Sequence, residues 1–82
     1  MSHPFRELDT VVLARDLPAS DLRTGDLGAI VHVHAPDRFE VEFVTASGRT
    51  QALLMLTADD LRPVAENDLL AVRPTHPHRG AA

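Results

Sequence analysis

The sequence contains no cysteine, lysine, tryptophan or tyrosine, and each absence narrows the possible functions. Without cysteine the chain can form neither a disulfide framework nor a catalytic thiolate, and a reducing compartment is the simplest setting. No stretch approaches the ~20 apolar residues that a membrane-spanning helix needs. The first residues also lack the basic and then apolar pattern of a secretory signal. We therefore expect a cytoplasmic protein that does not enter a membrane.

Basic charge is also scarce. All eight basic residues are arginines, against twelve acidic residues, which gives the 82-residue chain a formal net charge of −4. A protein that mainly binds the nucleic acid backbone neutralises many phosphates with basic side chains, so this balance argues against such a role. The same balance is compatible with a basic protein partner.

The most informative stretch runs from residue 25 to residue 44. Gly25 and Gly28 open a run rich in β-branched residues, a turn follows, and Phe39, Val41 and Phe43 then alternate with other residues. Glycine permits a sharp bend and the close approach of a neighbouring strand. The alternation gives one buried and one exposed face. This pattern predicts one hairpin of a small, strongly bent β-barrel.

Turn-forming residues divide the rest of the chain into similar short pieces. A long loop over 15–24 is expected after the first strand, and a short helical turn over 57–60, which Thr57 can cap, before the last. The expected strands cover about 8–14, 27–34, 39–44, 49–56 and 61–64. This layout predicts an all-β fold, a five-stranded SH3-like barrel.

A chain of this length makes one small domain. We expect the barrel domain over residues 5–72 and a flexible tail over 73–82, because the tail has almost nothing to bury. Residues 66–73 contain enough apolar side chains to dock as one more strand or as a short helix. The expected core contains Ile30, Val41, Phe43 and one of Leu53 or Leu54.

Several motifs of the chain resemble a bacterial family known as domain of unknown function 4926. They are L-D-T-V-V-L, a D-L-P turn, G-D-x-G-A-I-V, F-E-V-E-F-V, G-R-T, L-x-L-T and D-L-R, and they extend over roughly residues 8–72. The resemblance implies the same SH3-like barrel and no catalytic residues. It also implies a small protein encoded beside another small protein, an arrangement similar to an antitoxin or accessory protein and its partner. Residues 25–44 further resemble the KOW motif of ribosomal and transcription-factor barrels, although the shared element is the bend itself.

Two histidines suggest a metal site as an alternative. His32 and His34 are two apart on one expected strand, so their side chains point to the same side. If His34 faced Glu40 and His32 faced Glu42, two imidazoles and two carboxylates could bind zinc or nickel. The simpler interpretation, which we prefer, is an exposed polar face with cross-strand pairs. A β-bulge in this strand would break the pairing.

No catalytic residues are expected. A reaction centre needs a nucleophile or an acid–base pair in a pocket that excludes water, and a barrel of this size fills its interior with side chains. We therefore expect no enzyme activity and no cofactor. Nucleic acid binding is not expected either, because no exposed aromatic side chains are available for base stacking. A KOW-like nucleic-acid or ribosome-associated module remains the second hypothesis, and a histidine-based metal-binding protein the third.

Protein binding is the leading hypothesis. The fourth expected strand carries apolar groups on both faces, Leu53 and Met55 on one and Ala52, Leu54 and Leu56 on the other. Only one face can serve the barrel. The second face is covered by the segment of Leu69, Leu70 and Val72, by a partner encoded nearby, or by a second copy of the chain. The predicted partner-binding residues are Leu54, Leu56, Leu69 and Leu70, with Arg49 and Arg62 at the edge.

Overall fold

A computed structural model describes residues 5–34 and 36–75 of the chain. Its elements are strand β1 (Thr10–Leu13), the 3-10 helix η1 (Pro18–Ser20), strands β2 (Leu27–His34), β3 (Arg38–Val44) and β4 (Thr50–Thr57), the 3-10 helix η2 (Ala58–Asp60) and strand β5 (Leu61–Pro63). All five expected strands are present, and β2 has the predicted bounds. No helix among the described residues is long and apolar enough to span a membrane.

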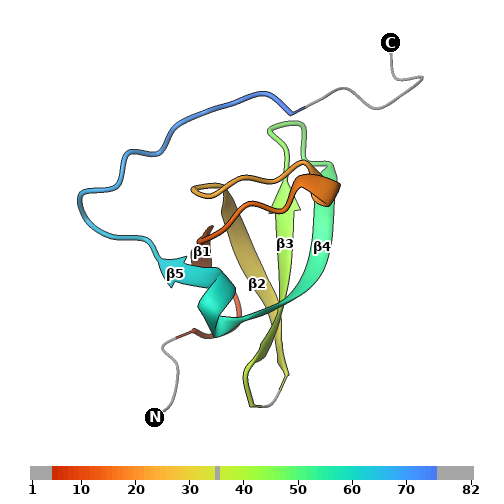
Figure 1. The fold of residues 1–82 in the computed structure, drawn as a ribbon, viewed down its shortest axis with the longest axis vertical. Helices are drawn as coiled ribbons and strands as arrows, with labels where there is room; N and C mark the ends of the chain where they lie inside the picture. Colours follow the sequence, from red (N-terminus) through yellow and green to blue (C-terminus); the bar gives the residue numbers. More distant parts are fainter. Residues whose placement is uncertain (1–4, 35, 76–82) are drawn as a thin grey trace.

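The strands form one antiparallel sheet in the order β4-β3-β2-β1-β5. Figure 1 shows β2, β3 and β4 side by side, with η2 between the end of β4 and the start of β5. Pro63 lies in β5, at one edge of the sheet, where its missing N–H costs no ladder hydrogen bond. The pairings confirm the all-β, five-stranded fold, and closure of this sheet into a barrel stays a prediction.

Two irregularities interrupt the pairing of the strands. The register between β2 and β3 shifts between Ile30 and His32, which is the kind of irregularity that the sequence of this strand allows. A second shift lies where Phe43 pairs with Ala52 and Val44 with Thr50, which leaves Gln51 as the extra residue of β4. The Gln51 side chain donates a hydrogen bond over 3.3 Å to the backbone oxygen of Ser20 in η1. This bulge therefore ties the loop after β1 to the start of β4.

The core lies on the inner face of this bent sheet. The predicted core residues Ile30, Val41 and Phe43 are buried, and Leu54 rather than Leu53 packs against them. The alternating burial of β3 confirms the pattern seen in the sequence. The remaining members of the core come from β1, β3, β4 and β5, from the loop after β1 and from the residues before β1: Phe5, Val11, Leu13, Leu22, Phe39, Leu56 and Leu61.

The helical turn before β5 is confirmed as η2, with Thr57 at its N-cap as expected and Asp60 completing a capping box. The Asp60 carboxylate accepts hydrogen bonds from the Thr57 backbone N–H, over 2.9 Å, and from the Thr57 hydroxyl, over 3.2 Å. It also forms an ion pair with Arg15, from the loop after β1. Burial raises the pKa of Asp60, yet the hydrogen bonds from Thr57 and Arg15 outweigh it and hold the pKa below its ordinary value.

Candidate protein-binding surface

After β5 the chain continues as an irregular stretch, residues 64–75, which we call the C-terminal segment. It opens with a turn in which the Asp68 N–H donates to the Ala65 oxygen over 3.1 Å and the Asp68 carboxylate accepts from the Ala65 N–H over 2.7 Å. Arg62 of β5 binds both oxygens of the same carboxylate, over 2.8 and 2.9 Å. These donors lower the pKa of Asp68 to about 2. The start of the C-terminal segment is therefore fixed to β5.

A second ion pair fixes the other end of the C-terminal segment. Arg73 binds the Asp26 carboxylate over 2.9 and 2.6 Å and donates to the Asp21 backbone oxygen over 2.9 Å. Burial raises the pKa of Asp26, but the hydrogen bonds from Arg73 and from the Arg23 N–H outweigh it, so the pKa lies below its ordinary value. Arg73 is the first residue of the tail expected over 73–82. Residues 76–82 of that tail lie outside the described residues.

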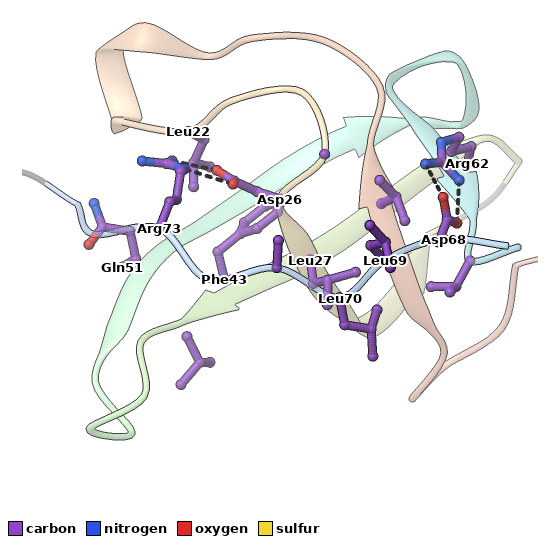
Figure 2. A pocket seen from close by; sticks show the side chains of 15 residues that line it. Leu22, Asp26, Leu27, Phe43, Gln51, Arg62, Asp68, Leu69, Leu70 and Arg73 are labelled. Carbon is purple, nitrogen blue, oxygen red and sulfur yellow. Dashed lines mark hydrogen bonds and ion pairs between the residues drawn. The ribbon is translucent and has the colours of Figure 1, made fainter. Parts of the chain in front are cut away.

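Between these two ion pairs the C-terminal segment passes over a hollow of about 290 Å³ at the end of the sheet where β2 begins and β3 ends. The buried side chains of Val12, Leu22 and Phe43 line it, and of these Leu22 and Phe43 belong to the core. Leu69 and Leu70 of the C-terminal segment line it from outside (Figure 2). The hollow thus combines apolar side chains with polar ones, and an Arg–Asp pair lies at each end.

Leu69 and Leu70 contribute little to the stability of the fold, because they remain 93% and 70% exposed. Val72, two residues on, is 99% exposed. Of the three covers considered for the fourth strand, this segment is therefore not the one in the structure, and residues 66–73 form neither a strand nor a helix. The two ion pairs hold the C-terminal segment at the hollow, so its apolar side chains stay in solvent.

The predicted outer face of the fourth strand needs a correction. Leu54 and Leu56 point inward, because they pair with Val41 and Phe39, whose side chains lie in the core. Directly opposite residues of an antiparallel pair share a face. The outer face of β4 therefore carries Leu53 and Met55, which are about half exposed at 51% and 50%.

The two arginines predicted at the edge of the binding surface lie at different places. Arg49 is exposed in the β3–β4 turn, where Gly48 takes a positive φ of 89° as expected. Arg62 lies beside the hollow and is already paired with Asp68. Sequence reasoning did not identify Asp26, Asp68 and Arg73 as members of this surface. Asp26 belongs to the G-D-x-G motif, but nothing in that motif indicates a partner in the C-terminal segment.

The histidines do not pair as the metal hypothesis requires. His32 lies opposite Glu40 and His34 opposite Arg38, each two positions from the partner that the metal hypothesis requires. In place of Glu42, His32 contacts Glu7, with 3.2 Å between its Nδ1 and the carboxylate. His34 contacts Glu40 over 3.5 Å. Within residues 5–34 and 36–75, no group of three or more metal-ligating side chains could hold a metal ion.

Two further observations concern the other function classes. All three phenylalanines of the chain are buried, which leaves no phenylalanine face for stacking against bases. The described residues also include no fully buried polar or charged residue.

Comparisons with curated proteins and with solved structures give no match. A family match does exist, and it covers residues 7–63, from just before β1 to the end of β5. The C-terminal segment lies beyond this match. The family is described as a domain of unknown function, DUF4926. Because the match spans more than half of the chain, this protein belongs to the DUF4926 family.

Proposed function

We propose that this protein is a non-catalytic protein-binding module built on an SH3-like barrel, the antitoxin or accessory partner of a protein encoded by a neighbouring gene. The observation that carries the proposal is the exposure of Leu69, Leu70 and Val72 on a segment that two ion pairs hold in place. The strand order, in which β1 lies between β2 and β5, is compatible with the proposed barrel.

The energetics favour binding at this surface. Removing a leucine or valine side chain from water contributes about 1.5–3 kcal/mol. In the free protein, Leu69 and Leu70 gain little of this, because most of their surface remains in water. A partner that covers these two leucines, and that places an apolar side chain in the hollow, would bury the apolar surface that the fold leaves in water. The Arg–Asp pairs at both ends would then form a polar rim around an apolar centre, the usual arrangement of a protein interface.

Fixing the C-terminal segment before binding also lowers the entropic cost of association. A free segment loses roughly 0.5–1.5 kcal/mol for each flexible side chain that becomes ordered at an interface. The bidentate pairs of Arg62 with Asp68 and of Arg73 with Asp26 restrict the segment in the unbound protein. They therefore preorganise the surface that the partner contacts.

Co-expression with the product of the adjacent gene, followed by gel filtration, tests the proposal. The unchanged protein should elute with that product as one complex. Leu70→Asp should weaken the complex by about tenfold or more, because a charge would be placed at the apolar centre. Leu8→Asp is the matched control: Leu8 is also exposed, at 86%, but lies before β1 and does not line the hollow.

Three results would contradict the proposal. The first is the absence of any complex with the adjacent gene product. The second is an equal effect of Leu70→Asp and Leu8→Asp on the complex. The third is tight, salt-sensitive binding to RNA, which would favour the KOW-like hypothesis.

A further inference from the structure

Strand β4 leaves one edge of the sheet unpaired. It stands at the end of the strand order and pairs only with β3. Among the described residues, positions 51–56 form no backbone–backbone hydrogen bond outside this pairing, and the N–H of Thr57 donates to the Asp60 carboxylate over 2.9 Å. In an antiparallel sheet every second residue of an edge strand directs its N–H and C=O away from its neighbour. Strand β4 stands at one edge of the sheet (Figure 1). Before Thr57, the N–H and C=O groups on its outer side are therefore available to pair with another strand.

This edge lacks the features that usually block the addition of another strand. Natural edge strands are short or carry charged residues, prolines or bulges. The opposite edge, β5, has three residues, two of which are Arg62 and Pro63. Strand β4 has eight residues, T-Q-A-L-L-M-L-T, with no charge and no proline, and its bulge lies near its start, at Gln51. One edge of the sheet is protected, and the other is open over about five residues.

The charges beside this edge indicate which strand would fit. On the outer face of the sheet, Glu42 lies opposite Leu53 and Glu40 lies opposite Met55. A strand added to β4 would lie about 4.8 Å from it and about 10 Å from β3. Arginine or lysine side chains of that strand could lay their apolar stems over Leu53 and Met55 and bring their charged ends to the two glutamates. A second copy of the chain would bring no such charge, since its own β4 has none.

We propose that β4 binds an extended segment of a protein partner as an additional antiparallel strand, with basic side chains at alternate positions facing Glu40 and Glu42. The inference rests on the proposed protein-binding function and specifies its chemistry. Backbone hydrogen bonds supply affinity in this mode of recognition, and alternate side chains supply specificity. The surface is separate from the hollow, whose lining includes neither Leu53 nor Met55.

Two short synthetic peptides test the inference on the complete protein. Both alternate threonine or valine with a charged residue, which is arginine in one peptide and glutamate in the other. Fluorescence anisotropy of the labelled peptides should show the arginine peptide binding about tenfold more tightly or better, because the glutamate peptide places like charges together. Methylation of alternate backbone nitrogens should abolish binding of the arginine peptide, because it removes the N–H groups that pair with β4.

Variants of the protein locate the binding site. Met55→Lys places a charge on the open edge and should weaken binding of the arginine peptide by about tenfold. Its half-exposed position lets the fold tolerate the change, which circular dichroism verifies. Leu69→Lys, the matched control on the C-terminal segment, should leave peptide binding unchanged. Equal binding of the two peptides, or equal effects of the two variants, would overturn the inference.

Two further outcomes separate this inference from the proposed function. The protein alone could form a dimer that Met55→Lys abolishes. This result would overturn the inference in favour of a second copy on β4. The complex with the adjacent gene product could be weakened by Leu70→Asp and unchanged by Met55→Lys. This result would overturn the inference and support the proposed function. The arginine peptide could bind at β4 while the protein forms no complex with that product. This result would support the inference and contradict the proposal that the partner is encoded by the neighbouring gene.

Discussion

Replacing Gly28 tests the packing on which the bent sheet depends. Gly28 is buried in β2, and a Cβ added to it would lie 2.7 Å from Cγ1 of Val41 and 2.8 Å from Cε2 of Phe43. Both atoms belong to buried core side chains, and neither is the end of a long flexible chain. The glycine is needed here for the close approach of a neighbouring strand, since its φ is not positive. Any side chain at this position therefore displaces the core.

The expected cost follows from the size of the added group. One methyl in a well-packed core costs about 1–3 kcal/mol, and valine at the same place exceeds this. A chain of 82 residues has a free energy of unfolding of about 4–12 kcal/mol, so Gly28→Val should leave a large unfolded population. Ala29→Val, one residue away and only half-buried, is the control and should change stability by about 0.5 kcal/mol.

Urea denaturation followed by circular dichroism measures these differences, since the chain has no tryptophan or tyrosine for fluorescence. A double-mutant cycle with Val41→Ala identifies the clash directly. If the Val41 side chain obstructs the added Cβ, Gly28→Ala should cost less in the Val41→Ala background, with a coupling of about 0.5–3 kcal/mol. Equal unfolding free energies for Gly28→Val and Ala29→Val, or a coupling of zero, would refute the reasoning.

Two other predictions concern the core and the C-terminal segment. Phe43→Ala should cost about 3–5 kcal/mol of unfolding free energy, because it removes a buried aromatic side chain, and a loss below about 1 kcal/mol in the same urea assay would be incompatible with its position. The depressed pKa of Asp68 means that its pairing with Arg62 stabilises the fold fully above the unfolded value of 3.8 and is lost as the pH falls through about 2. Carboxyl NMR titration should show this, and Arg62→Gln should raise the pKa toward 3.8. An unchanged pKa in that variant would exclude Arg62 as the cause.

The strands could be predicted because their signals are local. Alternation in residues 39–44, the turn at Gly48 and the run after Gly28 each depend on neighbouring residues alone, and the structure places strands or turns at all of them. The same holds for the buried Ile30, Val41 and Phe43. Register depends on the partner strand as well. The mixed phase of residues 29–33 allowed a bulge in β2, but which glutamate faces His32 could not be obtained from β2 alone.

The partner-binding face of β4 was placed incorrectly for a related reason. Leu53 and Leu54 are adjacent, and both faces of the strand are apolar, so alternation does not indicate which face is buried. Which face of β4 is buried depends on its pairing with β3. Phe39, Val41 and Phe43 point to the inner face, and the residues of β4 that pair with them point to the same face. A sequence with one polar face would have resolved the ambiguity, but β4 has none.

The C-terminal segment shows a different limit. The sequence left open whether residues 66–73 dock as a further strand or a short helix, and their position depends on the pairing of Arg73 with Asp26, residues 47 apart in the sequence. An ion pair over such a separation leaves no local pattern. Asp26 also accepts the Arg23 N–H over 2.8 Å, so one carboxylate closes the turn before β2 and anchors the segment. Turn composition accounts for an aspartate at position 26, but only the folded chain shows that it also holds Leu69 and Leu70 at the hollow.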